Sequence, residues 1–343
     1  MRLGTVIELV ETGQLAVLLS MARAVRVYYR VPFLASCIEN GVLALLRGGP
    51  VPIERIAASL ALPPGSQAGL RAWLEFGVRL GELRQSPAGF ALRSQLARRL
   101  AAPENDAAAA FVVEAARLHA RYVTDTPARL RAGRPFTLAD QDGRLVARSS
   151  RLLEPFVREA IDAVVPAHGP VRLLDIGCGS GTYLRHAAER NPELHALGLE
   201  LQADVAAFAR ENLVRWNLAG RVTIEVGDVR DRTPAPAFDV VLLLNNVNYF
   251  PVADRVAVLR HVRGFLRAGG RLLVTIGCAG SAAVDILNLW GAMTAGCGAL
   301  PSPDELAAHL EAAGFSAVRR RGLIPGYGYF AFCGSVEARA AGP

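Results

Sequence analysis

The chain has 343 residues, of which 52% are hydrophobic and 20% are charged. This length allows two domains, and this composition supports a large buried core and excludes an intrinsically disordered chain. Arginine supplies all 38 basic residues and the net charge is +7, so the absence of lysine excludes a Walker-type phosphate loop, a Schiff-base enzyme and a lysine general base.

The cysteines and the hydropathy pattern indicate the cellular compartment in which the protein is expected. Five cysteines lie at wide spacings without a CxxC pair, so neither a disulfide framework nor a structural zinc site is predicted. No stretch is apolar enough to span a bilayer, and Glu8 and Glu11 interrupt the region where a signal peptide needs an apolar core. We therefore expect a cytoplasmic protein without a membrane partner.

The first hundred residues have the pattern of helices followed by a hairpin. Apolar residues recur at spacings of three and four, with an interruption at Gly13. Three helices followed by a hairpin is the order of a winged helix, so we predict a winged-helix-like domain over residues 1–103. The predicted helices span residues 4–30, 33–46, 52–60 and 67–80, and the predicted hairpin spans residues 82–92.

A winged helix can bind DNA through its third helix. Here that helix, at residues 67–80, offers Arg71 and Arg79 as its only basic side chains among Leu, Trp, Phe, Val and Ala. Base reading needs Arg, Lys, Asn or Gln on the exposed face. We therefore predict a scaffold or dimerisation role and no nucleic-acid partner. A cofactor-sensing winged-helix regulator is the less favoured alternative, which salt-sensitive DNA binding would reveal.

From residue 166 onward, predicted strands alternate with helices, as in a doubly wound α/β domain. The preceding segment, residues 104–165, has a helical pattern. The last two predicted strands flank the turn Pro325-Gly326-Tyr327-Gly328 and form an antiparallel hairpin. The predicted strands span residues 171–176, 196–199, 222–226, 240–244, 272–276, 317–321 and 329–333, and the predicted helices span residues 183–190, 203–217 and 254–266.

The strongest chemical signal is the stretch Leu173-Leu174-Asp175-Ile176-Gly177-Cys178-Gly179-Ser180-Gly181-Thr182. A buried strand runs into a glycine-rich turn and then into a helix, so a ligand can lie against bare backbone beside free N–H groups. The spacing is G-x-G-x-G, whereas a dinucleotide site has G-x-G-x-x-G. Asp175 favours a cationic or amino-bearing ligand, because a pyrophosphate would meet like-charge repulsion there.

This stretch resembles motif I of the class I S-adenosylmethionine-dependent methyltransferases, and the resemblance extends over residues 166–343. It implies a Rossmann-like domain of seven strands, the seventh antiparallel, with S-adenosylmethionine as cofactor and S-adenosylhomocysteine as product. Glu200 and Asp228, which follow two predicted strands, match the family's ribose and adenine-amine contacts, for which a carboxylate is a suitable acceptor. The cofactor-binding residues so implied are Asp175, Gly177, Gly179, Gly181, Glu200, Leu201, Asp228, Val229 and Asn245.

With its helical first half, the chain resembles the small-molecule O-methyltransferase branch of that family. The resemblance implies a homodimer joined through residues 1–103, a helical linker and active-site roof at 104–165, and a methyltransferase domain at 166–343. The arginine- and alanine-rich composition is typical of bacteria whose enzymes of this kind modify secondary metabolites. A small-molecule secondary metabolite is therefore the expected acceptor.

The loop after the fourth predicted strand departs from that branch, whose catalytic base is a His in a His-Asp-Trp context. Aligning Phe250 with the Trp places Asn248 at the His position and Tyr249 at the Asp position. A general base contributes about 100- to 10,000-fold, and Asn cannot supply it. Transfer then relies on alignment and on an acceptor that is already nucleophilic, which predicts N-, C- or proximity-driven O-methylation.

In that interpretation Asn248 and Tyr249 are the catalytic residues and, with Asn245, orient the acceptor by hydrogen bonds. The alternative is that these groups only satisfy the loop backbone. The missing base also leaves open a non-methylating reaction that uses the sulfonium only for its charge. No metal is predicted, because no His/Asp/Glu cluster has clear metal-ligand spacing. The predicted substrate-binding residues are Tyr122, Asp285, Trp290 and Met293.

Overall fold

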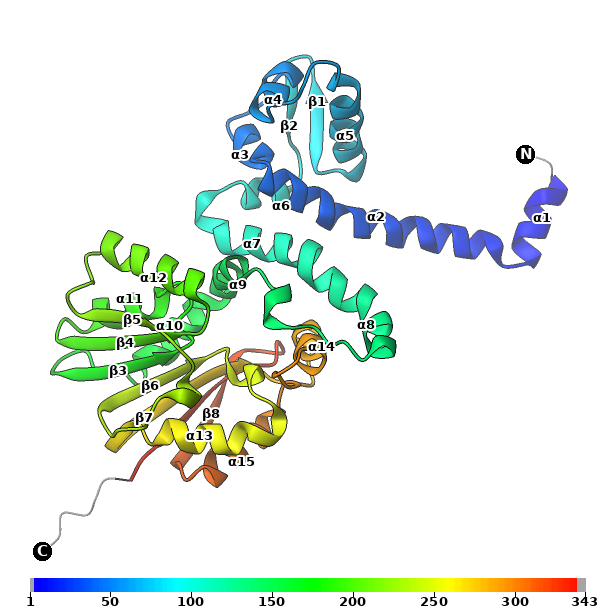
Figure 1. The fold of residues 1–343 in the computed structure, drawn as a ribbon. Helices are drawn as coiled ribbons and strands as arrows, with labels where there is room; N and C mark the ends of the chain where they lie inside the picture. The colour runs from blue at the N-terminus through cyan, green and yellow to red at the C-terminus, as the bar shows by residue number, and fades with distance from the viewer. Residues whose placement is uncertain (1–2, 338–343) are drawn as a thin grey trace, which may run out of the picture. The chain divides into compact units, whose positions relative to one another are not determined.

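The computed structural model describes residues 3–337, and Figure 1 shows its helices and strands. The chain divides into two compact units, Met1–Ala120 and Arg121–Pro343. The first unit has one hydrophobic core and the second has two, one on each face of a sheet.

The first unit is mainly helical, with one small hairpin. Strands β1 and β2 pair antiparallel, and Val51 adds a bridge to Phe90 on the far side of β2. The helices α3, α4 and α5 precede this hairpin in the predicted order. The elements are α1 (Leu3–Glu11), α2 (Gln14–Glu39), α3 (Val42–Leu46), α4 (Ile53–Ser59), α5 (Gln67–Leu80), β1 (Leu83–Ser86), β2 (Gly89–Leu92), α6 (Gln95–Leu100), α7 (Asp106–Glu114) and the π-helical η2 (Ala115–His119).

Helix α2 differs from the prediction of separate helices at 4–30 and 33–46. It continues through Pro32 to Glu39, and Gly41, with φ of +71°, separates it from α3. Pro32 removes one backbone donor, but Phe33 and Cys37 immediately after it are buried in the core of the unit. Tertiary packing therefore extends the helix past the residue that predicts its end.

Helix α2 is largely exposed from Gln14 to Tyr29, although this stretch is rich in apolar residues. Leu18, Val27 and Tyr28 are 57%, 65% and 61% exposed, respectively. Within the part of the chain that the structure describes, no single helix meets the length and hydropathy needed to cross a membrane. Residues Gly4–Glu11 of α1 and helix α2 meet them only when taken together, and these helices are bent by 77°.

The second unit is built on a seven-stranded sheet with the order β5-β4-β3-β6-β7-β9-β8. Neighbouring strands from β5 to β7 are parallel, and β9 is antiparallel to both of its neighbours. The predicted α/β fold with an antiparallel seventh strand is therefore confirmed. The strands are β3 (Val171–Ile176), β4 (Leu194–Glu200), β5 (Val222–Val226), β6 (Phe238–Leu244), β7 (Leu266–Gly277), β8 (Ser316–Ile324) and β9 (Tyr329–Ser335).

Helices cover both faces of this sheet (Figure 1). Helices α10, α11 and α12 contribute to the core on one face, and α13 and α15 to the core on the other. Helix α13 ends earlier than the predicted 254–266, because β7 already begins at Leu266. The helices of this unit are α8 (Ala120–Ala132, which begins at the unit boundary), α9 (Gly143–Ser149), α10 (Glu154–Asp162), α11 (Thr182–Arg190), α12 (Ala203–Arg215), α13 (Arg255–Arg263), α14 (Asp285–Met293) and α15 (Pro303–Ala312).

The strand order determines where a ligand can bind. The chain leaves β3 toward β4 on one side and reaches β6 on the other, so the order reverses between β3 and β6. Ile176 at the end of β3 lies in register with Leu199 of β4 and Leu243 of β6. Loops that follow these three strands therefore begin at the same edge, which is where open α/β sheets bind their ligands.

Candidate active site

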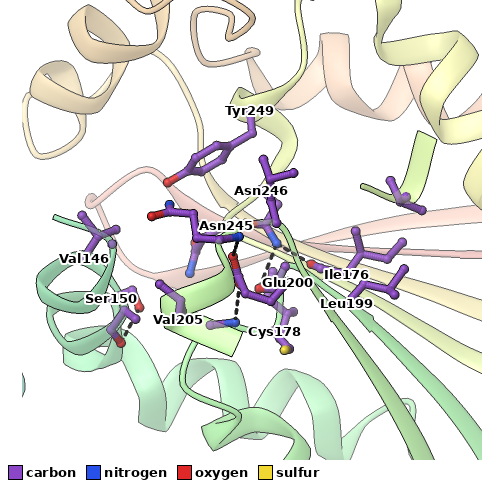
Figure 2. Close-up of a pocket in the computed structure, with 18 of the residues that line it drawn as sticks. Val146, Ser150, Ile176, Cys178, Leu199, Glu200, Val205, Asn245, Asn246 and Tyr249 are labelled. Carbon is purple, nitrogen blue, oxygen red and sulfur yellow. Dashed lines mark hydrogen bonds between the residues drawn. The ribbon is translucent and has the colours of Figure 1, made fainter. Parts of the chain in front are cut away.

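A cavity of about 380 Å³ opens at this edge of the sheet (Figure 2). Its walls come from the turn after β3, the ends of β4, β5 and β6, helix α9 and residues 295–296. Of the residues predicted from the sequence, it brings together Gly177, Gly179, Glu200, Leu201, Asp228, Val229, Asn245 and Tyr249.

The glycine-rich turn is held by its backbone. Gly177, Gly179 and Gly181 have φ of +69°, +54° and +79°, which glycine adopts without steric cost. The N–H groups of Gly177 and Cys178 donate to the Leu199 carbonyl oxygen at 2.7 and 3.0 Å. A Cβ at Gly177 would overlap the Asn246 carboxamide, so the first glycine is required by close packing as well. Gly181 lies behind the cavity wall and caps α11.

Glu200 points into the cavity from the end of β4 (Figure 2). Its Oε2 accepts a hydrogen bond from the Gly179 N–H at 3.0 Å, and its Oε1 accepts one from the Gln202 N–H at 3.1 Å. Burial raises the pKa of this carboxyl group, and the backbone hydrogen bonds oppose that rise. The carboxylate is thus fixed in orientation, with acceptor capacity left for hydroxyl groups of a ligand.

Asp228 follows β5 and is held by Arg230. The Arg230 Nε donates to both Asp228 carboxylate oxygens at 3.0 Å, and the Arg230 backbone N–H donates to Oδ1 at 2.9 Å. These hydrogen bonds lower the pKa of Asp228. Val229 lies beside it, and Leu201 is an apolar wall residue with 47% of its surface exposed. An apolar wall beside a carboxylate suits a flat base with an amino group.

Asp175 does not line the cavity. It is 1% exposed, and neither of its carboxylate oxygens has a hydrogen-bond partner among the described residues. Burial, together with the charge of Glu200, raises the pKa of Asp175 to about 7. An uncompensated carboxylate behind the glycine-rich turn favours positive charge in the cavity.

Asn245 begins the loop after β6 and is fixed from below by β7 and β9. Its backbone has φ of +59°, a conformation that Asn tolerates better than most residues. The Tyr329 hydroxyl lies 2.8 Å from the Asn245 Oδ1 and 3.1 Å from the Thr275 Oγ1. Tyr329 and Thr275 are buried, so this network anchors the Asn245 side chain at the cavity wall.

Asn248 and Tyr249 lie on the next turn, a 3-10 helix at Val247–Tyr249. Tyr249 lines the cavity, whereas Asn248 is 6% exposed and is outside the lining residues. The Asn248 backbone oxygen accepts a hydrogen bond from the Gly298 N–H at 2.9 Å. The structure therefore brings Tyr249 to the cavity and Asn248 behind it.

The four predicted substrate-binding residues lie outside the cavity wall. Trp290 is buried, and its ring centroid lies 5.0 Å from that of Tyr249. Tyr122 packs edge-on against Phe136, whose N–H donates to the Met293 carbonyl oxygen at 2.8 Å. Asp285 is exposed at the start of α14. Trp290 thus contacts a cavity residue directly, and Met293 and Tyr122 meet at Phe136.

Several cavity residues escaped prediction from the sequence. Helix α9 supplies Val146 and Ala147, and Ser150 and Arg151 follow it; only a general helical pattern marked this segment. Asn246 also lines the cavity, and its one signal was a polar residue next to a buried strand. Tyr329 is 84 residues away from Asn245, so only the fold reveals their contact.

The titratable side chains of the cavity wall are few. They are Arg151, Cys178, Tyr183, Glu200, Asp228, Arg230 and, on the loop after β6, Tyr249. Within residues 3–337, no histidine lines the cavity, and no group of three or more His, Cys, Asp or Glu residues is placed to hold a metal ion.

Comparisons with known proteins agree with this geometry. Residues 174–272 match a methyltransferase domain family. The chain is 28% identical over 313 residues to demethylspheroidene O-methyltransferase of Cereibacter sphaeroides. This alignment covers 85% of this chain and 79% of the relative. It is 36% identical over 132 residues to nocamycin O-methyltransferase of Saccharothrix syringae, covering 38% of this chain and 45% of the relative.

The fold is also that of solved methyltransferases. The structure of mitomycin 7-O-methyltransferase superposes with a TM-score of 0.76 at 22% identity, covering 95% of this chain and 100% of that one. The cavity suits the cofactor of such enzymes, because Glu200 and Asp228 present carboxylate oxygens that can accept hydrogen bonds and the buried Asp175 favours a cation. The chain therefore carries a methyltransferase domain and resembles the class I S-adenosylmethionine-dependent enzymes of the small-molecule O-methyltransferase branch.

Proposed function

We propose that this enzyme methylates an oxygen atom of a small organic molecule of the secondary-metabolite type, without a histidine base. The relatives named as O-methyltransferases of spheroidene and nocamycin type support oxygen as the acceptor atom. The loop at 245–250, which has Asn, Tyr and Phe where that branch has His-Asp-Trp, supports the absence of a base.

One observation carries the mechanistic part of this proposal. The carboxylates of the cavity wall, Glu200 and Asp228, lie at the ends of β4 and β5, and Tyr249 is the titratable residue on the acceptor loop. Tyrosine has an ordinary pKa of about 10 and is a poor base at neutral pH. The acceptor must then arrive already nucleophilic, as an acidic hydroxyl group does. Amines and enolate-like carbons meet the same requirement and are the alternative acceptors.

The cofactor-binding roles follow from the donors and acceptors in the wall. S-adenosylmethionine supplies an electrophilic methyl group on a sulfonium. Glu200 accepts hydrogen bonds from the ribose hydroxyls, and Asp228 accepts one from the adenine amine beside Val229 and Leu201. Gly177 and Gly179 let the ligand approach the backbone, and Gly181 caps α11 behind the cavity wall. The negative charge of Asp175, behind the turn, attracts the positive charge of the sulfonium.

At the other end, Asn245 and Tyr249 orient the acceptor, and Asn248 holds their loop against Gly298. Trp290 supports the Tyr249 ring. Met293 and Tyr122 extend the same apolar region through Phe136, and Asp285 stands at its exposed rim. Productive alignment within such a pocket accelerates transfer without proton abstraction by the protein.

The test is a pH–rate comparison across a series of hydroxylated aromatic acceptors of graded acidity. S-adenosylhomocysteine formation and acceptor mass are followed by mass spectrometry. We expect the inflection of each profile to follow the pKa of the acceptor hydroxyl. A common inflection near pH 6.5 for every acceptor would indicate a histidine base and would contradict the proposal. Cofactor binding without turnover of any hydroxyl, amine or carbon acceptor would favour the non-methylating alternative.

We also propose that a second copy of the chain covers α1 and α2, as a homodimer formed through residues 1–103. A helix that is apolar all round is normally buried, yet Leu18, Val27 and Tyr28 are largely exposed in a single chain. Light scattering should give a dimer, and Leu18→Glu with Val27→Glu should give a monomer. A wild-type monomer would contradict this proposal.

We place the enzyme in the cytoplasm, because all five cysteines are free thiols.

A further inference from the structure

Asn246 is the residue at which the cofactor-binding turn and the acceptor loop meet. It follows β6, lines the cavity and lies between Asn245 and the turn that carries Tyr249 (Figure 2). Its side chain and its backbone make contacts in opposite directions.

On the side of the proposed cofactor site, the Asn246 carboxamide forms hydrogen bonds with the glycine-rich turn. Its Nδ2 donates to the Ile176 carbonyl oxygen at 2.5 Å and lies 3.4 Å from the Gly177 carbonyl oxygen. Gly177 has no Cβ, and a Cβ there would overlap this carboxamide. The position of the first turn residues is therefore set by Asn246 from one side.

Toward the acceptor, the Asn246 backbone starts the turn that presents Tyr249. Asn246 is the N-cap of the 3-10 helix Val247–Tyr249, and its carbonyl oxygen accepts a hydrogen bond from the Tyr249 N–H at 2.9 Å. A movement of the glycine-rich turn that displaces the Asn246 side chain thus displaces the start of the Tyr249 turn.

The same loop is tied to residues 295–300, of which Ala295 and Gly296 line the cavity. The Gly298 N–H donates to the Asn248 carbonyl oxygen at 2.9 Å. Arg255, which is 1% exposed, donates through Nε to the Phe250 carbonyl oxygen at 3.3 Å and through Nη2 to the Ala299 carbonyl oxygen. A buried guanidinium group that donates to two carbonyl oxygens fixes the distance between the loop at 245–250 and residues 295–300.

We propose that Asn246 is a positioning residue that couples cofactor binding to the order of the acceptor site. Cofactor seated on the glycine-rich turn fixes the Asn246 side chain, and the contacts just described pass this order to Tyr249 and to residues 295–300. The acceptor site is then complete only after the cofactor has bound. This inference rests on the proposed assignment of the acceptor end.

Asn212 provides a matched control. Its Nδ2 donates to the Ser180 carbonyl oxygen at 3.0 Å from helix α12, so it fixes the same turn from the other side. It has no link to the loop at 245–250 within the described residues. Loss of Asn212 should weaken cofactor binding but leave the coupling intact.

The first measurement is calorimetric titration of the full chain with S-adenosylhomocysteine. Asn246→Ala and Asn212→Ala should each raise Kd about tenfold, because each removes a side-chain hydrogen bond to the turn. Asn246→Asp should raise Kd further, to about 100-fold, because a carboxylate would face two carbonyl oxygens. If wild type binds no S-adenosylhomocysteine, the cofactor site itself is refuted, and that failure is distinct from failure of the coupling.

The second measurement is hydrogen exchange with saturating S-adenosylhomocysteine. In wild type and in Asn212→Ala, the ligand should slow amide exchange about tenfold at 177–181, 246–250 and 295–300. In Asn246→Ala, protection should remain at 177–181 and be lost in the other two segments. Two results would overturn the proposal. One is that Asn246→Ala protects residues 246–250 as strongly as wild type does. The other is that wild type binds the ligand but shows no protection at 246–250. Circular dichroism confirms that each variant is folded.

Discussion

The two ends of the cavity are built from different kinds of interaction. At the cofactor end, the carboxylates of Asp175, Glu200 and Asp228 stand around a turn of three glycines with positive φ. At the proposed acceptor end, Asn245 is held by the Tyr329 hydroxyl group of β9, and the Tyr249 ring packs against Trp290.

In the proposed function, this difference determines how each end recognises its ligand. A cationic cofactor with a ribose and an amine requires fixed anions and bare backbone, and few residue types provide these. An acceptor positioned by shape and amide hydrogen bonds can be served by many different residues. The cofactor end should therefore respond to changes in charge, and the acceptor end to changes in alignment.

The largest effect concerns the charge behind the glycine-rich turn. The pKa of Asp175 in the folded chain is raised to about 7, whereas an unfolded Asp has a pKa of about 3.9. The folded state thus binds more protons between these values, so the contribution of Asp175 to stability is present at low pH and is lost as pH rises toward 7. Asp175→Asn should stabilise the chain at pH 8 by up to about 4 kcal/mol.

Urea unfolding of wild type and Asp175→Asn at several pH values measures this difference. The two proteins should converge near pH 4 and separate as pH rises. Asp204→Asn, which changes an exposed carboxylate, is the control and should alter stability little at any pH. A constant difference between wild type and Asp175→Asn from pH 4 to 8 would show that the Asp175 carboxyl is not strained by burial.

Glu200→Gln should give the next largest effect. The substitution keeps the size of the side chain but replaces one carboxylate oxygen by an amide donor, which cannot accept a ribose hydroxyl hydrogen bond. We expect Kd for S-adenosylhomocysteine to rise about 100-fold, measured by calorimetry. Glu225→Gln on the neighbouring strand, whose partner is Arg232 at 2.5 Å, should bind like wild type. Comparable Kd values for the two variants would remove Glu200 from the ribose site.

At the proposed acceptor end, Tyr249→Phe should lower kcat/KM about tenfold, since alignment and not charge is lost. Asn248→Ala should lower it less, because Asn248 contacts Gly298 through its backbone oxygen, which the substitution keeps. Kd for S-adenosylhomocysteine should stay unchanged for Tyr249→Phe. Steady-state kinetics with an acceptor found by mass-spectrometric screening provides the measurement. Unchanged turnover in both variants would mean that Asn248 and Tyr249 serve only the loop backbone.

Much of the fold was predictable because buried strands and glycine turns leave strong local patterns. The ends of β3 and β5 agree with the predicted 171–176 and 222–226. Helix α2 was not predictable in this way, because Pro32 indicates a break that the packing of Phe33 and Cys37 prevents. Local signals fail where long-range burial outweighs them.

The same contrast between local signals and long-range contacts applies to the residues of the site. Gly177, Glu200 and Asp228 were predicted because each stands at or just after the end of a strand, and these strand ends meet at one edge. Asn246 and Tyr329 act through partners that are 70 and 84 residues away. Nothing in their local sequence marks those contacts, so only the three-dimensional register of the sheet reveals them.

The smallest effect tests this hidden contact between Tyr329 and Asn245. Tyr329→Phe keeps the buried ring but removes the hydroxyl that bonds the Asn245 Oδ1 and the Thr275 Oγ1. We expect about 1 kcal/mol of lost stability and a threefold lower kcat/KM, of about 0.6 kcal/mol. Because the hydroxyl acts through Asn245, Asn245→Ala should lower kcat/KM no further in the Tyr329→Phe background. Tyr327→Phe in the adjacent turn is the control, and fully additive effects would separate Tyr329 from the site.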